Sequence, residues 1–245
     1  EYKLPKNTYF QFNIEATDPD GDALLYMAHQ ADFNQFGKAR FPSNRPTESN
    51  HIEFYQPYRK NNNTNEWEKV PYKFTGENET GVFTFWLGVS DGKIGAYKDG
   101  KPHVALYDVY ETKVNIVGGT PFKITSVSKS TINWSVDKNI FGNDSKVRIL
   151  FSDDYGKTYK YVLADGLPNN GQATVIFPTQ AKGWKGGNLY VEGIFKIEVL
   201  NHIAYAVSNE KPYLLDMHSP DITFENLPEP VITVKKNAIP EKPNV

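Results

Sequence analysis

Hydrophobic and polar residues alternate along much of the chain. In the segment 8–16, the alternation places Phe10, Phe12 and Ile14 on one face and polar residues on the other. Successive side chains of a β-strand point to opposite faces, so this pattern predicts strands that bury one face. The same pattern runs through the segments 82–92, 145–152, 173–178 and 195–201.

Turn-forming residues separate the predicted strands. Asp20-Gly21, Asp91-Gly92 and Asp99-Gly100 are typical of tight turns. No segment carries a helical hydrophobic stripe over three turns. Many short strands without helices predict an all-β chain made of immunoglobulin-like or fibronectin-III-like β-sandwiches.

The chain of 245 residues is long enough for two such domains in tandem. Gly118-Gly119 follows one predicted strand and precedes another, which makes it the expected boundary. We therefore predict a first sandwich over 1–117, with a long insertion at 31–81 that carries short strands and packed turns. A second sandwich is predicted over 118–217, and a Pro-rich tail or linker over 218–245.

Composition excludes several kinds of partner. The formal net charge is only −2, which gives no electrostatic basis for binding nucleic acid. No apolar stretch is long enough to cross a membrane, so we expect no membrane insertion. Cysteine is absent, which excludes disulfides and zinc–thiolate sites. Since the chain opens on Glu1 without a signal peptide, we expect a mature protein or a piece of a longer one.

Three carboxylates cluster at Asp18, Asp20 and Asp22 in the stretch "EATDPDGDALLY". The spacing does not fit an EF-hand, which requires Gly at the sixth position and Glu at the twelfth. Two interpretations remain open. The aspartates can bond backbone amides of a Pro-Asp-Gly turn, or they can hold a calcium ion, with Asp91 as the distant ligand.

Motifs for catalysis are weak in this sequence. "GVSDG" matches the Gly-x-Ser-x-Gly of serine hydrolases, but no helix is predicted after it, so we expect Ser90 to end a strand. No two of the five histidines have the spacing of a zinc pair. We therefore predict that this chain is not an enzyme. The histidines are His29, His51, His103, His202 and His218.

The stretch "SDDYGKTY" fits the pattern known as an Asp box, which is a hairpin turn. We expect Asp154 to bond the amides of the turn and Gly156 to adopt a positive φ. We also expect Tyr159 to fold back onto the sheet. One copy does not support a propeller, in which the motif recurs once per blade.

Exposed aromatic residues are the candidate ligand contacts. Trp86 lies on the face opposite Phe85, and Trp184 lies in a Gly- and Lys-rich loop. With Tyr97, they could form a platform for sugar rings. For Trp184, an anchor of its own loop is the favoured interpretation over a sugar platform, and Trp134 is expected in a sandwich core.

An ordered series of motifs adds a family resemblance. "LPKNTYFQFNIEATDPDGDALLY", "ARFPSNRPTESNHIEFYQP", "NEWEKVP" and "FTFWLGVSDG" occur in this order, followed by "GTPFKITSV" and "VRILFSDDYGKTYKYVLADGLPNN". Together they resemble the region downstream of the catalytic domain in secreted reprolysin-type zinc metalloproteases of Bacteroidetes-like bacteria. The resemblance covers residues 1–209 and implies a secreted or cell-surface protein. The catalytic His-Glu-x-x-His motif is absent from the chain.

These observations predict a non-catalytic accessory module of a secreted or surface bacterial protein. The resemblance implies an upstream catalytic domain in the same polypeptide as the partner. A stand-alone module that binds carbohydrate or mediates adhesion, with a host protein or glycan as partner, is the alternative. A hydrolase with a site assembled from distant residues is the third hypothesis.

Overall fold

The structure is a computed structural model of the chain. It describes residues 1–18, 21–32, 41, 45–54, 59–60, 67–68, 80–91, 97–98, 101–102, 107–128, 131–154, 156, 158–176, 190–208 and 213–216. Within some short strands and at a few strand ends, the backbone is described and the side chains are not.

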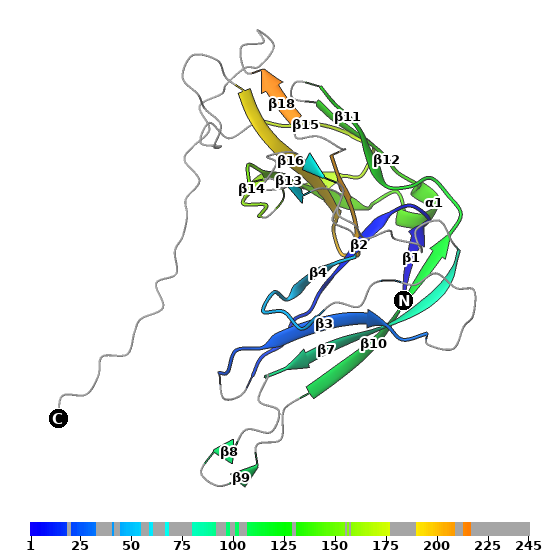
Figure 1. Ribbon diagram of the computed structural model, residues 1–245. Helices are drawn as coiled ribbons and strands as arrows, with labels where there is room; N and C mark the ends of the chain where they lie inside the picture. Colours follow the sequence, from blue (N-terminus) through cyan, green and yellow to red (C-terminus); the bar gives the residue numbers. More distant parts are fainter. Residues whose placement is uncertain are drawn as a thin grey trace, which may run out of the picture.

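The described residues are almost entirely β, as the alternation predicts (Figure 1). Among these residues one short helix, α1 (Lys138–Phe141), interrupts the strands. It begins after Asp137, whose side chain accepts a hydrogen bond from the Asn139 amide, a common N-terminal cap. None of the described helices has the length and hydrophobicity needed to cross a membrane.

The described strands form three larger sheets and two small ribbons. The first sheet has the order β1 (Tyr2–Pro5), β10 (Tyr107–Val117), β7 (Gly81–Ser90) and β3 (Leu25–Gln30). The second has the order β11 (Lys123–Ser128), β12 (Thr131–Ser135) and β15 (Gln172–Thr174). The ribbons pair β5 (Arg59–Lys60) with β6 (Trp67–Glu68) and β8 (Tyr97–Lys98) with β9 (Lys101–Pro102).

The third sheet, called the shared sheet below, runs through both halves of the chain. Its seven strands are β14 (Tyr161–Pro168), β13 (Lys146–Ser152), β16 (Tyr190–Val199), β17 (Ala204–Val207), β2 (Tyr9–Asn13) and β4 (His51–Glu53), with β18 (Tyr213–Asp216) beside β16. The join lies where β17 pairs with β2 and Ala204 faces Phe10. Next to this pair, the Gln11 amide donates a hydrogen bond to the Ile203 carbonyl at 2.9 Å, which continues the pairing of the two segments.

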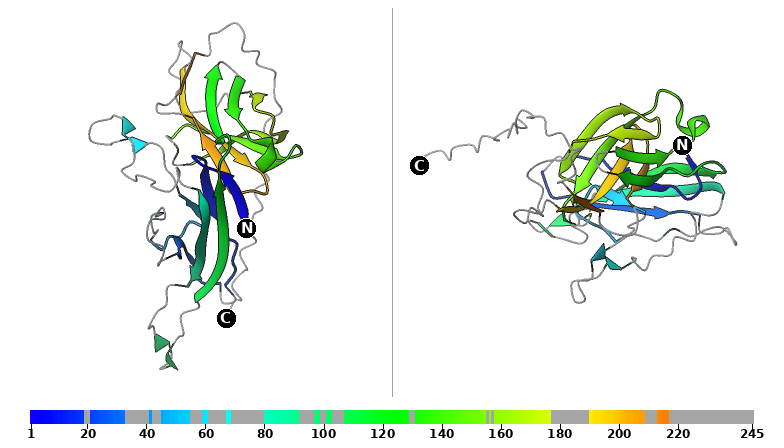
Figure 2. Two further views of the ribbon diagram at one scale, coloured as in Figure 1. Left: turned by 90° about the vertical axis from the view of Figure 1, so that its right-hand side faces the viewer. Right: turned by 90° about the horizontal axis from the view of Figure 1, so that it is seen from above.

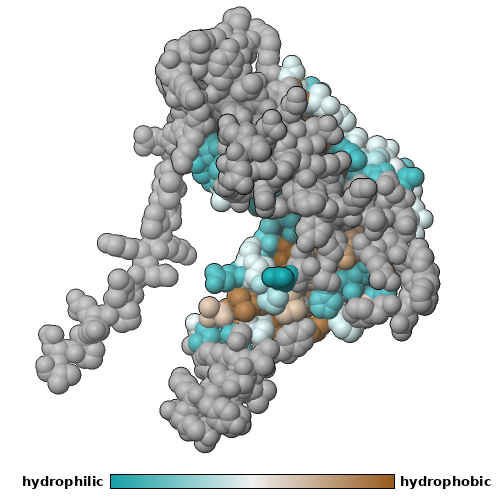
Figure 3. All heavy atoms as spheres, viewed as in Figure 1, coloured by the Kyte–Doolittle hydropathy of each residue, from teal (hydrophilic) through white to brown (hydrophobic). Residues whose placement is uncertain are grey.

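Figures 1 and 2 show where the pairing of β17 with β2 lies relative to the other strands. The sheet of β3, β7 and β10 forms one end of the molecule, and β11, β12, β13 and β16 form the other. β2 lies between them. The surface around β3 mixes hydrophilic and hydrophobic residues (Figure 3).

The predicted domain boundary falls between β10 and β11, where the backbone is closely held. The Thr120 amide donates to the Asp137 carboxylate at 3.0 Å, and the Phe122 amide donates to the Thr8 hydroxyl at 2.9 Å. Gly119 has a φ of 139°, and a Cβ there would lie 2.6 Å from the same carboxylate. A side chain at Gly119 would be strained by the positive φ and would displace the Asp137 side chain. The division into two domains stays a prediction.

The hydrophobic core is continuous through the two halves and rich in phenylalanine. Phe10 stacks on Phe54 at 5.0 Å, and Phe85 meets Phe54 edge to face at 5.1 Å. The same cluster extends to Phe122 and Phe195 in the second half, both fully buried. Ring pairs of this geometry add to the stabilisation from burial.

The predicted strands 8–16, 82–92, 145–152 and 195–201 overlap β2, β7, β13 and β16, whereas only 173–174 of the predicted strand 173–178 belong to a described strand, β15. Val147, Ile149 and Phe151 are fully buried on one face of β13. Trp134 is 4% exposed, and its indole N–H donates to Asn169 at 2.8 Å, so its predicted place in the core is confirmed. β4, β5 and β6 fall inside the segment 31–81, as expected for an insertion with short strands. The predicted tail 218–245 lies outside the described residues.

Candidate functional site

The face of the shared sheet that points away from the core carries a cluster of polar side chains. On β2, Phe10 and Phe12 enter the core, so the alternation turns Gln11 to the other face. On β16, Phe195 and Ile197 enter the core, so Lys196 lies on that same outer face. We call this group the Lys196 cluster; its members are Gln11, Asn13, His51, Glu53, Tyr159, Lys196, Glu198 and Tyr205.

Lys196 is the centre of the cluster. The residue is only 1% exposed. Its Nζ lies 2.5 Å from Oε1 of Glu53 and 3.2 Å from Oε1 of Glu198. It also lies 3.3 Å from Nε2 of His51. Two carboxylates therefore compensate one ammonium group that has lost nearly all contact with water.

The other polar residues of the Lys196 cluster form hydrogen bonds that hold the carboxylates of Glu53 and Glu198 in place. His51 Nε2 lies 3.1 Å from Glu53, and its Nδ1 lies 2.6 Å from the Asn13 side-chain oxygen. Gln11 donates from Nε2 to Glu198 at 2.9 Å. Since β2 and β4 precede residue 118 and β16 follows it, the cluster links the two halves of the chain through side chains.

Two tyrosine rings cover the ammonium group. Nζ of Lys196 lies 4.6 Å from the ring centre of Tyr205 and 5.1 Å from that of Tyr159. Both distances are within the range for attraction between a cation and an aromatic face. Tyr205 also packs with Ile194 and Val207 in a small apolar cluster on the same face. The ammonium group thus contacts two carboxylates and two tyrosine rings.

The charges of the cluster are mutually dependent. Burial raises the pKa of Glu53, but the bonds and charges of His51 and Lys196 outweigh it, so the pKa is lowered from its ordinary value. Burial, followed by the nearby carboxylate of Glu53, raises the pKa of Tyr159 far above that of a free tyrosine. Glu53 is held ionised and Tyr159 is held neutral, which suits an ion-pair cluster that supports the fold.

The Asp box has the predicted geometry and supplies Tyr159. The carboxylate of Asp154 accepts from the Thr158 amide at 2.9 Å and from the Thr158 hydroxyl at 2.6 Å. Ser152 donates to Asp154 at 2.7 Å and accepts from the Gly156 amide at 2.7 Å. Gly156 has a φ of 79°. The predictions for Asp154, Gly156 and Tyr159 are confirmed, and the turn holds Tyr159 over Lys196.

Among the described residues of the aspartate cluster, Asp18 accepts hydrogen bonds from amides close to it in the chain. The Gly21 amide donates to the Asp18 carbonyl at 3.2 Å, and the Asp22 amide donates to the Asp18 carboxylate at 3.1 Å. Gly21 has a φ of 75°, a conformation that glycine adopts without strain. Asp20 lies outside the described residues. The bond from the Asp18 side chain to a local amide is the one that the turn interpretation predicts.

Asp91 lies at the same end of the sheet as this turn. Leu25 pairs with Ser90, so Asp91 continues β7 at the point where β3 begins. Within the described ranges, no group of three or more histidine or acidic residues could hold a metal ion. Because Asp20 is not among those residues, the calcium site stays a prediction.

Of the three aromatic candidates, only Trp86 has a described side chain. It is 37% exposed on the outer face of the first sheet, and its indole N–H donates to Glu111 at 3.2 Å. The ring of His29 on the neighbouring strand meets it edge on at 5.8 Å. Tyr97 belongs to β8, but its side chain is not described, and Trp184 lies outside the described residues.

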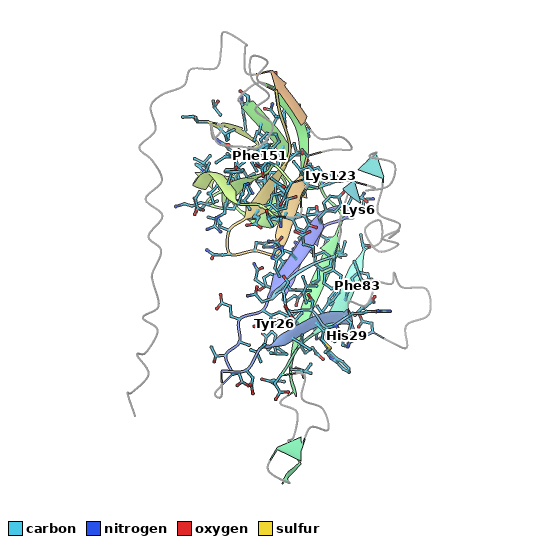
Figure 4. The ribbon with its side chains drawn as sticks, turned by 60° about the vertical axis from the view of Figure 1, so that its left-hand side comes forward. Lys6, Tyr26, His29, Phe83, Lys123 and Phe151 are labelled. Carbon is cyan, nitrogen blue, oxygen red and sulfur yellow. The ribbon has the colours of Figure 1, made fainter. Side chains whose placement is uncertain are left out.

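Those candidate catalytic residues that the structure describes do not lie together. Ser90 is the last residue of β7, as predicted. His29 is on β3, and Figure 4 shows it at the end of the molecule away from Phe151 on β13. His51 belongs to the Lys196 cluster, and His202 follows β16. His103 and His218 lie outside the described residues.

Sequence reasoning did not identify the Lys196 cluster. The signal available was local: Lys196 and Glu198 alternate with hydrophobic residues in "FKIEVL", which indicates one polar face. An ordinary solvent-facing strand has the same pattern. Only the pairing of β17 with β2 brings these residues to Glu53, 143 positions away in the chain.

Comparison with models of known protein families gave no match for this chain. A comparison with curated proteins also gave no match. The resemblance to the metalloprotease region therefore stays a prediction from the motifs.

Proposed function

We propose that this chain is a non-catalytic accessory module that acts as a rigid support within a secreted or cell-surface bacterial protein. The single observation that carries the proposal is the shared sheet, which passes from residues of the first half to residues of the second. The parent protein, on this proposal, is a zinc metalloprotease with its catalytic domain upstream.

Rigidity follows from the kind of contact between the halves. Two domains joined only by a linker move relative to each other, because few contacts cross the boundary. Here backbone hydrogen bonds cross it, as from the Gln11 amide to the Ile203 carbonyl. The buried ion pair of Lys196 with Glu53 crosses it as well. A hinge at this place would break both.

A support role also suits the chemistry of the described residues. In the Lys196 cluster an ammonium group lies against two carboxylates and two tyrosine rings, and an ammonium group has no lone pair with which to attack a substrate. Ser90 and the described histidines are dispersed over separate strands and turns. These positions favour a structural role over hydrolysis.

The test is to separate the halves. The fragments 1–117 and 118–217 are produced alone and compared with the full chain by circular dichroism and proton–nitrogen NMR spectra. We expect neither fragment to give the dispersed spectrum of a folded domain, since each loses part of the shared sheet. Two fragments that fold alone, together with independent tumbling of the halves in the full chain, would contradict the proposal.

The enzymatic alternative is tested separately. Purified full-length chain is incubated with casein and with ester and glycoside substrates, and we expect no turnover above buffer. The complete open reading frame checks the proposed parent, because it should encode a His-Glu-x-x-His domain before these residues.

Binding of carbohydrate is a second candidate, favoured by the exposed indole of Trp86. A sugar ring can pack on the face of an indole while a neighbouring carboxylate, here Glu111, accepts its hydroxyl groups. A glycan array with the wild-type chain and with Trp86→Ala tests it. If the wild-type chain gives a specific signal that Trp86→Ala loses, carbohydrate binding is supported. If the wild-type chain gives no signal on the array, carbohydrate binding is excluded.

A further inference from the structure

The turn between β14 and β15 carries the single Asn-Gly pair of the chain, Asn170-Gly171. Asn170 is exposed at the surface. Gly171 has a φ of 91° and no side chain that could shield its backbone nitrogen. Among the described residues, no hydrogen bond holds the Gly171 N–H. An accessible backbone nitrogen therefore follows directly on an exposed side-chain amide.

This pair has the groups for a reaction that needs only hydroxide and water. Hydroxide removes the proton of the Gly171 amide, and its nitrogen bonds to Cγ of Asn170. The bond from Cγ to Nδ2 breaks, ammonia leaves, and a five-membered succinimide ring remains. Water then opens the ring at one of its two carbonyl groups. Opening at Cγ gives aspartate, and opening at the backbone carbonyl gives isoaspartate, in which the main chain runs through Cβ.

We propose that Asn170 is a site of spontaneous deamidation, and that this modification loosens the attachment of the turn to β12 as the protein ages. The Gly171 carbonyl accepts a hydrogen bond from the Trp134 amide at 2.9 Å. One residue further on, Gln172 pairs with Asn133 of β12. Isoaspartate adds one backbone atom directly before Gly171, so it changes the spacing at the point where the turn meets β12.

The residue before the pair cannot move to absorb the added atom. Asn169 is fully buried, and its side-chain oxygen accepts from the Trp134 indole at 2.8 Å. The Asn169 amide donates to the Ser145 carbonyl at 2.9 Å, and the Lys138 ammonium group donates to the Asn169 carbonyl. Since Asn169 is held on three sides, the displacement falls on Gly171 and on its bond to Trp134.

The aspartate product also disturbs the turn. Nδ2 of Asn170 donates to the Gln172 carbonyl at 2.9 Å and to the Pro168 carbonyl at 3.3 Å. An ionised carboxylate only accepts hydrogen bonds, so it would face two carbonyl oxygens without a donor between them. Both products of the reaction therefore weaken the turn.

Mass spectrometry of the full chain tests the modification. Samples are kept for weeks at neutral and at mildly alkaline pH, and then digested and mapped. We expect a gain of about 1 Da at Asn170, since NH₂ is replaced by OH. The gain should be faster at alkaline pH because hydroxide starts the reaction, and isoaspartyl methyltransferase should label the product. Asn143 is the internal control: it is also exposed, but the side chain of Asp144 hinders the attack, so its gain should be much slower.

Amide hydrogen exchange measured by NMR tests the consequence. The aged and fresh chains are compared at the same neutral pH. We expect the Trp134 amide to have about tenfold less protection in the modified chain, as for the loss of one hydrogen bond. The Ile197 amide in the core should not change, since the effect is local.

Asn170→Ser separates deamidation from other changes on storage. Serine suits a turn and has no side-chain amide, so this variant should gain no mass in the turn and should keep its Trp134 protection during storage. The time course of the wild-type chain does not depend on the stability of the variant. No mass gain at Asn170, an equal gain at Asn143, the same loss of protection in stored Asn170→Ser, or unchanged Trp134 protection in the modified chain would overturn the proposal.

Discussion

Replacing Lys196 by methionine should remove the charge that binds the two halves together. Methionine is unbranched like lysine and one heavy atom shorter, so the substitution removes the ammonium group and creates little cavity. The ammonium group is lost from between Glu53 and Glu198, at 2.5 and 3.2 Å, and two carboxylates are left facing each other.

The expected loss can be bounded from the structure. Breaking a fully buried ion pair by removing one partner costs roughly 3–5 kcal/mol, because the remaining charge is desolvated. The side chains of Glu53 and Glu198 are 20% and 17% exposed, so water partly solvates them after the change. We therefore expect Lys196→Met to lower the free energy of unfolding by about 3 kcal/mol.

Urea unfolding of the full chain, followed by tryptophan fluorescence and circular dichroism, measures this loss. Arg148→Met is the matched control, since Arg148 and Asp165 form an ion pair on the same sheet with side chains 40% and 50% exposed. The control should lose less than about 1 kcal/mol, as exposed pairs do.

A double-mutant cycle isolates the pair with Glu53. Glu53→Gln is made alone and with Lys196→Met, and the double variant should be more stable than the sum of the two losses implies, by about 2 kcal/mol. A loss below about 1 kcal/mol for Lys196→Met, or additive losses in the cycle, would refute the view that Lys196 links the halves electrostatically.

Three further predictions concern the core, the Asp box and the aspartate turn. Phe85→Ala, which removes a fully buried ring that contacts Phe54, should cost about 3–5 kcal/mol in urea unfolding; a cost below 1 kcal/mol would contradict the described core. Asp154→Asn should make unfolding less pH-dependent. Burial raises the pKa of Asp154, but the bonds from Thr158 and Ser152 lower it overall, so its contribution is present above pH 3.8 and is lost as the pH falls through the folded-state value. Unfolding midpoints from pH 7 to 3 check this, and equal slopes for variant and wild type would contradict it. The predicted calcium site gives a higher Tm in excess calcium than in chelator, by mass action; identical melting curves exclude it.

The local structure of the Asp box and of the strands was readable in the sequence because short-range rules determine it. Gly156 adopts a positive φ and Asp154 bonds an amide four residues later, both within one turn. Likewise, the alternation in "TYFQFNIEA" places Phe10 and Phe12 in the core, whatever the partner strand is.

The surroundings of Trp86 and Lys196 could not be predicted in the same way. The pattern turns both side chains away from the core, but it does not say what covers them. Trp86 is on a face that leaves it 37% exposed, whereas Lys196 is 1% exposed beneath Tyr159 and Tyr205. Their burial depends on which distant segments pack above each strand.

The sequence alone determined an all-β chain, the faces of its main strands and the turns that join them, because these depend on neighbours a few residues apart. The tertiary structure alone decided that β17 pairs with β2, so that one sheet crosses the Gly118-Gly119 junction. Backbone pairing is indifferent to sequence distance, and many hydrophobic strands have similar edges. The choice of partner rests on the fit of the whole core and of buried charges such as Lys196, which no local pattern encodes.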